Sequence, residues 1–344
     1  MALVSPREYW DYAISSPRCV TTPEDGEQYT PSLEAICDHL GCSFVKGMVA
    51  EVRSDGVTLD NGEVLEARAV VVAIGGSYLG NAIWKARPDE VTAAQRLDGF
   101  RAKAKEIGAA QHVVVGGAGL VGVEVAGEIK SRWPDKSVTL VGRVGGAERL
   151  RQKTERALDE LGVTVVPDRT IGEPSEGVVQ LKSGADPLPC DLLLSCAGFS
   201  YDPACLRAHF SSAITDRGMV MADSQLRVQG AENVYALGDI VATPDGAFNP
   251  AAGIMKAGKQ AEVVAANVAS VLKGQRAKKS YVWPSTAAAA AKPALTAFGP
   301  SNAVAFLGMP GCASFAEDKV ARKAKAADFF MAHAGKMYGK GKTW

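Results

Sequence analysis

Apolar runs alternate with amphipathic stretches through the middle of the chain. Residues 112–115 form an apolar strand pattern, and a glycine-rich turn separates it from a helical pattern over 120–132, which Pro134 ends. A second apolar strand over 138–141 and a helical pattern over 148–161 follow. Strand, glycine turn, helix and strand in this order predict a right-handed βαβ unit.

The flanking segments carry further signals. Residues 1–40 show only weak patterns. After them the pattern predicts a strand over 44–52, a hairpin over 57–65, a buried strand over 69–74 and a helix over 89–107. Beyond the βαβ unit, 233–239 reads as a short strand and 249–272 as one long Ala-rich helix.

One pattern occurs twice. Residues 56–75 and 177–198 each combine a hairpin with a glycine turn, a short polar linker, an apolar strand and a final glycine. The spacing from Gly62 to Gly75 is 13 residues, and that from Gly184 to Gly198 is 14. A coincidental likeness of two hairpins is the alternative. The matched endings favour two related nucleotide-binding units in one chain.

Composition narrows the class of protein. The chain has 344 residues, 47% of them apolar, and 38 basic residues balance 38 acidic ones. This is the composition of a globular protein long enough for two domains, and its zero net charge disfavours a nucleic-acid partner. The start has no signal-peptide pattern and no apolar run is long enough to cross a membrane, so we expect a cytoplasmic protein.

Seven cysteines are scattered along the chain without metal-ligand spacing, which favours reduced thiols. Cys37 and Cys42 lie five residues apart, and a redox pair is one interpretation of them. The spacing is not Cys-x-x-Cys and no glycine-rich turn precedes it, so a helix end with incidental cysteines is the favoured interpretation.

The strongest motif is Gly117-Ala118-Gly119-Leu120-Val121-Gly122, between a predicted strand and a predicted helix. In that context Gly117 permits a tight turn, Gly119 lets a pyrophosphate approach the backbone, and Gly122 lets helix and strand pack closely. The free N–H groups and partial positive charge of the helix start then face the phosphates. A purely structural glycine turn is the less favoured alternative.

The residue after the next strand bears on the choice of nucleotide. That strand ends Val141-Gly142-Arg143 and offers no acid for a ribose 2′-hydroxyl. Arg143 therefore favours NADPH over NADH, although an exposed Arg with relaxed cofactor choice explains the pattern almost as well.

Gly238-Asp239 follows the predicted strand near residue 235 and suits a flavin site. A carboxylate at a strand end can accept hydrogen bonds from ribitol hydroxyls, and the start of the following helix can stabilise a reduced flavin ring. An ordinary Asp-containing turn is the alternative. No catalytic triad or paired carboxylates are evident, and hydride transfer between cofactors requires none.

The C-terminal segment from Lys319 carries seven Lys or Arg residues and one acid, interleaved with aromatic residues. Such a segment can contact a membrane surface. A solvated helix whose aromatic residues pack on the body is a slightly favoured alternative.

Taken together, these motifs resemble the pyridine nucleotide-disulfide oxidoreductase-like flavoproteins. The likeness is to their apoptosis-inducing-factor-like, ferroptosis-suppressor branch, near the type II NADH:quinone oxidoreductases. It is most specific over 112–130, 191–199, 233–240 and 257–268. The implied fold is α/β with two Rossmann-like domains. The implied domains are a flavin domain (1–105 and 219–280), an NAD(P)H domain (106–218) inserted in it, and a small C-terminal α+β region (281–344).

The resemblance also implies roles for single residues. It places the adenine-contacting backbone at Val49 and the flavin-domain glycine motif at Ala73 and Gly75, with Gly198 closing the matching strand of the other domain. Glu124 is expected near the nicotinamide, and Asp239 at the flavin ribitol. The segment from Met255 to Gly258, with Ala257, is expected beside the isoalloxazine.

The implied activity is electron transfer from NADPH or NADH through FAD to a quinone or a similar small acceptor. The chain departs from the family at its start, where the strand and glycine turn that hold the FAD pyrophosphate are expected before Leu3, and Ser5 takes the place of an acid on the adenosine ribose. A non-catalytic NAD(P)H-binding or regulatory protein without tightly bound FAD is therefore the alternative. A disulfide reductase is disfavoured, because no cysteine pair lies in the first helix.

Overall fold

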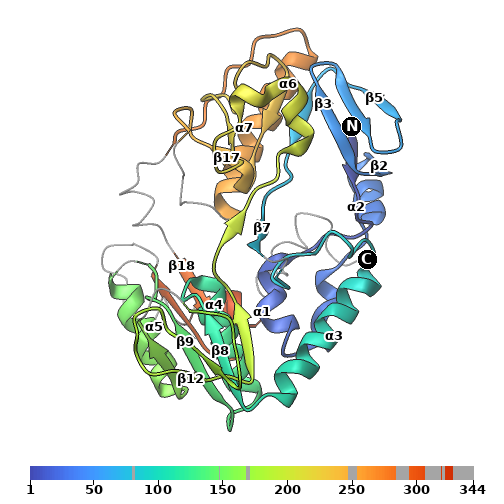
Figure 1. Cartoon of the computed structure of the whole chain (residues 1–344). Helices are drawn as coiled ribbons and strands as arrows, with labels where there is room; N and C mark the ends of the chain where they lie inside the picture. The colour runs from blue at the N-terminus through green and yellow to red at the C-terminus, as the bar shows by residue number, and fades with distance from the viewer. Residues whose placement is uncertain are drawn as a thin grey trace.

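The computed structural model describes residues 1–79, 82–146, 148–167, 171–246, 254–283, 294–306, 319 and 322–327. Its strands and helices gather into two groups, which Figure 1 shows one above the other, with β7 (Ser77–Tyr78) and β14 (Phe199–Ser200) in the region between them.

One group is built on a four-stranded parallel sheet. Its strand order is β10 (Val163–Val166), β9 (Ser137–Val141), β8 (His112–Gly116) and β13 (Leu192–Ser195). Helices α4 (Leu120–Arg132) and α5 (Glu148–Glu160) form the crossovers from β8 to β9 and from β9 to β10. The predicted βαβ unit is thus confirmed, and α4 has the predicted bounds.

The second group contains three separate two-stranded parallel sheets and one antiparallel sheet. The parallel pairs are β1 (Ala2–Ser5) with β2 (Ser43–Lys46), β6 (Val70–Val72) with β16 (Val234–Ala236), and β15 (Val220–Met221) with β17 (Val241–Ala242). The antiparallel sheet comprises β3 (Val49–Arg53), β4 (Gly56–Leu59) and β5 (Val64–Glu66). No continuous sheet like that around β8 is present here among the described residues.

The repeat seen in the sequence is also a structural repeat. The antiparallel hairpin β4–β5 precedes β6, and the hairpin of β11 (Val178–Val179) with β12 (Leu188–Pro189) precedes β13. Both β6 and β13 are members of parallel pairs. One hairpin-and-strand unit therefore occurs in each group.

Helices and a C-terminal hairpin complete the fold. The other α-helices are α1 (Ser16–Cys19), α2 (Leu33–Leu40), α3 (Ala93–Ala109), α6 (Arg207–Phe210) and α7 (Ile254–Leu272). Short 3-10 helices include those at Pro23–Tyr29 and Gly238–Ile240. The hairpin of β18 (Ala294–Ala297) and β19 (Ala303–Phe306) and a π-helical turn, η7 (Arg322–Ala326), pack beside α4 and α5.

Some element boundaries differ from those predicted. The single strand expected over 44–52 is two strands, because β2 pairs with β1 whereas β3 pairs with β4, and the chain turns between them near Gly47. Helix α3 begins at Ala93 rather than at residue 89, since Thr92 and Gln95 form a capping box. The expected helix over 249–272 is described from Ile254, and 249–253 lie outside the described residues.

Two large apolar cores and two smaller ones stabilise the groups. Of the large cores, one surrounds β8, β9 and α4 and includes Phe298 of the C-terminal hairpin, and the other surrounds β6 and β16. Among the described residues, no helix is long and apolar enough to cross a membrane.

Candidate functional site

The glycine turn after β8 has the geometry that a pyrophosphate needs. Gly117 has a φ of 111°, which residues with a side chain rarely adopt, and its N–H donates to Val141 O at 2.8 Å. A Cβ on Gly122 would lie 1.8 Å from Gly117 O. Both positions therefore require glycine for the turn itself.

Gly119 differs, because a Cβ placed on it would meet no atom within 4 Å. Space thus lies open in front of its backbone. The first helical hydrogen bond runs from Val123 N to Gly119 O, so the amides at the start of α4 have no carbonyl partner within the helix. Open space before unpaired amides at a helix start fits a nucleotide diphosphate.

Ala118 and Arg143 lie at the same edge of this sheet. Ala118 is buried, and Gly142, with a φ of 141°, closely approaches its backbone. Arg143 follows directly and is exposed to solvent. No acid occurs between β9 and Arg143. This placement suits recognition of a ribose 2′-phosphate, which stays a prediction.

An aromatic cluster lies where the two groups of elements meet. Tyr78 and Phe199 pair across β7 and β14, with their rings 5.2 Å apart and edge to face, and Tyr201 contacts Phe199 at 5.3 Å. Gly76 lies against these rings, and a Cβ on it would be 2.5 Å from Phe199. The two strands that end the repeat units therefore converge on one point.

Two charged residues, Lys85 and Asp239, lie beside the aromatic cluster. Lys85 Nζ lies 3.2 Å from Asp239 Oδ2 and 4.6 Å from the centre of the Phe199 ring. Gly75, with a φ of 66°, is close to the same ammonium group, since a Cβ there would lie 3.9 Å from Lys85 Nζ. The predicted residues Gly75 and Asp239 are thus brought together, with Lys85 between them.

Helix α7 supports the Asp239 turn. Gly238, with a φ of 83°, donates its N–H to the side-chain oxygen of Gln260 at 2.8 Å. Gln260 is fully buried, and its Nε2 has no hydrogen-bond acceptor in the described part of the chain. A buried amide donor of this kind needs a partner, and a bound group with acceptor atoms would provide one.

Several predicted residues lie around this centre. Ala73 is exposed just before Gly75, and the backbone of Met255 and the partly buried Ala257 belong to the first turn of α7. Gly198 has a φ of 82° and contacts Leu79 beside the β7–β14 pair. Val49 packs against the second core from β3. Their contacts with a cofactor stay predictions.

Glu124 is buried on α4 and forms an ion pair with Lys325 of η7. Ala297 N also donates to its carboxylate at 3.4 Å. Burial raises the pKa of Glu124, although Lys325 opposes this effect. The carboxylate thus faces the C-terminal hairpin, and a role beside the nicotinamide stays a prediction.

The surroundings of Tyr78 keep its phenol protonated. Burial raises the pKa of Tyr78, and the negative charges of Cys196, Glu124 and Asp239 raise it further. The phenol therefore stays protonated at neutral pH.

One turn further along α4, Glu128 accepts two hydrogen bonds of 2.9 Å from Arg18, which also donates to Ala326 O at 2.8 Å. Both residues are buried, since Arg18 is 3% exposed and Glu128 is 2% exposed. Two buried ion pairs therefore connect α4, α1 and the C-terminal segment. Lys325 and Ala326 of the basic C-terminal segment are thus buried, whereas Arg322 and Lys323 are exposed, and 328–344 lie outside the described residues.

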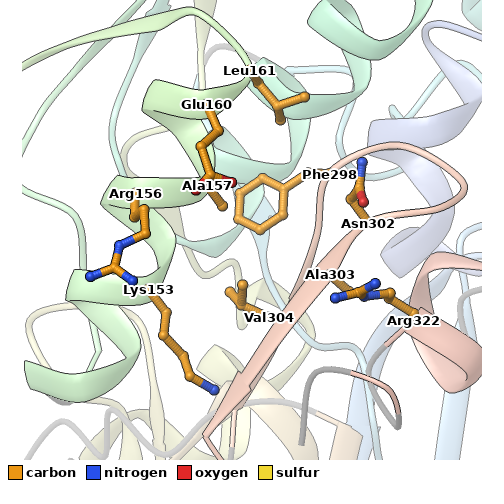
Figure 2. A pocket seen from close by; sticks show the side chains of 10 residues that line it. All are labelled: Lys153, Arg156, Ala157, Glu160, Leu161, Phe298, Asn302, Ala303, Val304 and Arg322. Atoms are coloured by element: carbon orange, nitrogen blue, oxygen red, sulfur yellow. The ribbon is translucent and has the colours of Figure 1, made fainter. Parts of the chain in front are cut away.

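A separate pocket of about 440 Å³ opens between α5 and the C-terminal hairpin. Figure 2 shows Lys153, Arg156 and Glu160 on one side of it and Phe298, Val304 and Arg322 on the other. No predicted cofactor residue lines this pocket. It is therefore distinct from the site at the glycine turn.

A βαβ sheet with an anion-binding turn, joined to a second unit with a matching hairpin and strand, defines a two-dinucleotide-binding fold. Residues 13–270 match the family model of the pyridine nucleotide-disulphide oxidoreductases. The chain belongs to this family, whose members use FAD and NAD(P)H.

Individual relatives support this assignment. Ferroptosis suppressor protein 1 of Xenopus tropicalis is 30% identical over 255 residues, which cover 69% of this chain and 66% of the relative. An FAD-dependent oxidoreductase of Flammulina velutipes is 31% identical over 232 residues, covering 65% of this chain and 69% of the relative. The matched part thus spans about two thirds of the length of these relatives.

Solved structures share the fold. The sulfide:quinone oxidoreductase of Aquifex aeolicus superposes with a TM-score of 0.68 and 15% identity, covering 99% of this chain and 90% of that chain. A ferredoxin reductase of Rhodopseudomonas palustris gives 0.63 and 18% identity, with coverages of 90% and 76%. The predicted α/β fold with two Rossmann-like units is confirmed.

Lys85 and the three aromatic residues were missed by the sequence reasoning. The sequence nevertheless contained a signal for the aromatic residues. In both repeat units the final glycine is followed by one variable residue and then by Ser-Tyr. Gly75 is followed by Gly76-Ser77-Tyr78, and Gly198 by Phe199-Ser200-Tyr201. The shared Ser-Tyr ending marks the strands that pair between the two groups.

Proposed function

We propose that this chain is an FAD-dependent oxidoreductase that takes a hydride from NAD(P)H. The observation that carries the proposal is the open space before Gly119, on the same molecule as the Asp239–Lys85 pair and its adjoining aromatic cluster. Bound FAD supplies the chemistry by accepting a hydride and passing the electrons on.

The residues of the chain would bind and orient the two cofactors. The amides at the start of α4 would hold the nicotinamide dinucleotide by its diphosphate, and the exposed Arg143 would favour NADPH. Asp239 would accept hydrogen bonds from the ribitol, while Gln260 Nε2 offers a buried donor. Tyr78 and Phe199 would cover the region between the two groups and exclude water from it.

We further propose a quinone or a similar small molecule as the acceptor. Support comes from the shared fold of the sulfide:quinone oxidoreductase. Because substrate choice depends on the residues of the site rather than on the fold, an assay with a quinone tests this proposal. Oxidation of NADPH by the purified protein should become faster when a water-soluble benzoquinone is added, and a rate independent of the quinone would refute this acceptor.

The visible spectrum of the purified protein tests the main proposal. A yellow protein whose flavin absorbance bleaches when NADPH is added, without oxygen, supports it. Asp239→Ala should weaken FAD binding about tenfold, by loss of a charge-assisted hydrogen bond, and should therefore lower the ratio of flavin to protein in the purified sample. Asp55→Ala, which removes an exposed carboxylate paired with Arg53, should leave that ratio unchanged.

A second function is favoured by one observation. On the flavin side, β1–β2 and β6–β16 are separate two-stranded sheets, whereas the nicotinamide side has one continuous sheet. A chain with this asymmetry could bind NAD(P)H as a regulatory signal without retaining FAD. A colourless protein that binds NADPH, even after incubation with added FAD, would support this alternative.

The place of action is likewise a proposal. The six described cysteines are free thiols, in keeping with the reducing cytoplasm. Contact with a membrane surface through the basic C-terminal segment is proposed from its sequence. Vesicle flotation with anionic lipids, comparing the full chain with a variant in which Lys336, Lys340 and Lys342 are replaced by Gln, tests this contact.

A further inference from the structure

Helix α2 ends in a motif that brings two cysteines together. Gly41 has a φ of 68°, and its N–H donates to Asp38 O at 3.3 Å, while Cys42 N donates to Cys37 O at 2.9 Å. These two hydrogen bonds define a Schellman motif, in which the residue after the left-handed glycine folds back over the last helical turn. Residues five apart at this helix end, here Cys37 and Cys42, are therefore next to each other in space.

The two cysteines are neighbours across this motif. The 2.9 Å hydrogen bond from Cys42 N to Cys37 O brings their backbones together, and in a Schellman motif the side chains at these two positions commonly pack against each other. Both cysteines are free. Cys37 is only 1% exposed, whereas Cys42 is half-buried and within reach of solvent. Burial and the neighbouring Cys42 raise the pKa of Cys37. One accessible thiol is thus held against one sheltered thiol.

The position of the pair in the fold gives a link between them a structural consequence. Cys42 directly precedes β2, which begins at Ser43 and pairs with β1 in parallel register. Helix α2 also packs against β2. A covalent link from α2 to the residue before β2 would fix the helix end against the strand.

We propose that Cys37 and Cys42 form a redox-active dithiol, which hydrogen peroxide converts to an intramolecular disulfide. Cys42 attacks one peroxide oxygen as the thiolate, the O–O bond breaks, and water leaves after protonation. The sulfur of Cys37 then loses its proton and attacks the resulting sulfenic acid, and the S–O bond breaks with release of a second water. The two sulfurs lose two electrons, and the peroxide gains them.

Peptide mass spectrometry of the full chain tests this proposal. The reduced protein is treated with hydrogen peroxide, alkylated with iodoacetamide and digested with trypsin and Glu-C. Cleavage after Glu34 and Lys46 releases a peptide of residues 35–46, with Cys37 and Cys42 as its cysteines. We expect this peptide without alkyl groups and about 2 Da lighter than the dithiol form. A peptide with two alkyl groups, or with Cys42 overoxidised and Cys37 alkylated, would overturn the proposal.

The same digest contains an internal control. The tryptic peptide of residues 183–207 holds Cys190, Cys196 and Cys205, and it should carry three alkyl groups after the same treatment. A disulfide within this peptide would show that peroxide oxidises the cysteines unselectively. It would count against Cys37 and Cys42 as a dedicated redox pair. A Cys205→Ser variant should link Cys37 to Cys42 as the wild type does.

Two further measurements separate the role of the fold from that of the sequence. In Cys37→Ser, Cys42 should stop at the sulfenic acid and react with dimedone, and absence of that adduct would contradict the assigned order of attack. The link should also form about tenfold faster in the native chain than in guanidinium, since the Schellman motif positions the thiols. Equal rates would refute positioning by the fold. These assays need neither flavin nor nicotinamide nucleotide, so they are independent of the proposed function.

Discussion

Replacing Gly119 by Ala should separate nucleotide binding from folding. A Cβ at this position meets no atom within 4 Å, and its φ of −73° and ψ of −178° suit alanine. Ala is a poorer N-cap than Gly, but it lowers the entropy of the unfolded chain by about 0.4–1 kcal/mol. The two effects oppose each other, so the free energy of unfolding should stay within about 1 kcal/mol of wild type.

Nucleotide affinity should fall, because the added methyl group occupies the space proposed for the diphosphate. Losing one charge-assisted hydrogen bond to a phosphate costs about 1.5–3 kcal/mol. That corresponds to roughly 10- to 150-fold weaker binding of NADPH, measured by fluorescence titration. Binding at the wild-type affinity would refute the placement of the diphosphate at this turn.

Gly122→Ala is the matched comparison within the same motif. Its Cβ would lie 1.8 Å from Gly117 O, a backbone atom that cannot move without opening the turn. Overpacking of this kind costs about 1–3 kcal/mol. Thermal unfolding should therefore shift down by several degrees in Gly122→Ala and hardly at all in Gly119→Ala. Equal melting temperatures would contradict the reasoning from glycine geometry.

Three further substitutions test the buried charges and the nucleotide preference. Arg18→Ala leaves Glu128 buried without its cation and should lower the free energy of unfolding by about 3–5 kcal/mol in denaturant titrations. Arg151→Ala, which removes an exposed ion pair with Glu148, should leave the free energy of unfolding nearly unchanged. Because the pKa of Glu124 is raised in the fold, the folded chain keeps a proton that the unfolded chain releases, and stability falls as the pH rises above the ordinary value of 4.5. Glu124→Gln should therefore flatten the dependence of stability on pH in that range, and an unchanged slope would count against the raised pKa. Arg143→Ala should weaken NADPH at least about tenfold more than NADH, and equal effects on both nucleotides would refute selection by Arg143.

The elements around the glycine turn before α4 could be predicted because their signals are local. The strand β8, the helix α4 and the strand β9 follow from apolar periodicity, glycines at the turn and Pro134 after the helix, all within about 30 residues. The positive φ values of Gly117 and Gly142 belong to the same short segment. Nothing distant was needed to specify this half of the site.

The rest of the site depends on pairings between distant residues. Tyr78 meets Phe199 only because β7 and β14 pair across the two groups of elements. The sequence places Lys325 in a basic segment expected to be solvated or to contact a membrane, yet Lys325 is buried against Glu124. Charge patterning along the chain does not reveal which partner a lysine finds in the fold.

The end of α2 shows how one spacing can carry two interpretations. The sequence favoured a helix end at Cys37 and Cys42 over a redox pair, and the helix end is confirmed by Gly41. The Schellman geometry that ends the helix is also what brings the thiols together. The helix end thus brings Cys37 and Cys42 as close together as a redox pair requires. The two interpretations are compatible.

The two halves of the site differ in how their ligand-binding turns are supported. The turn at Gly119 follows the central strand of a four-stranded sheet and is followed by a helix that two buried ion pairs anchor. The turn at Asp239 follows β16, which pairs with the three-residue strand β6 and with the segment around Arg227, and it depends in addition on Gln260 and Lys85. The strands β6 and β16 beside the Asp239 turn have three residues each, whereas β8 and β9 beside the Gly119 turn have five each. Bound FAD would therefore contribute more to ordering its own site than NAD(P)H does to ordering the α4 turn, because a ligand that binds only the ordered state stabilises that state.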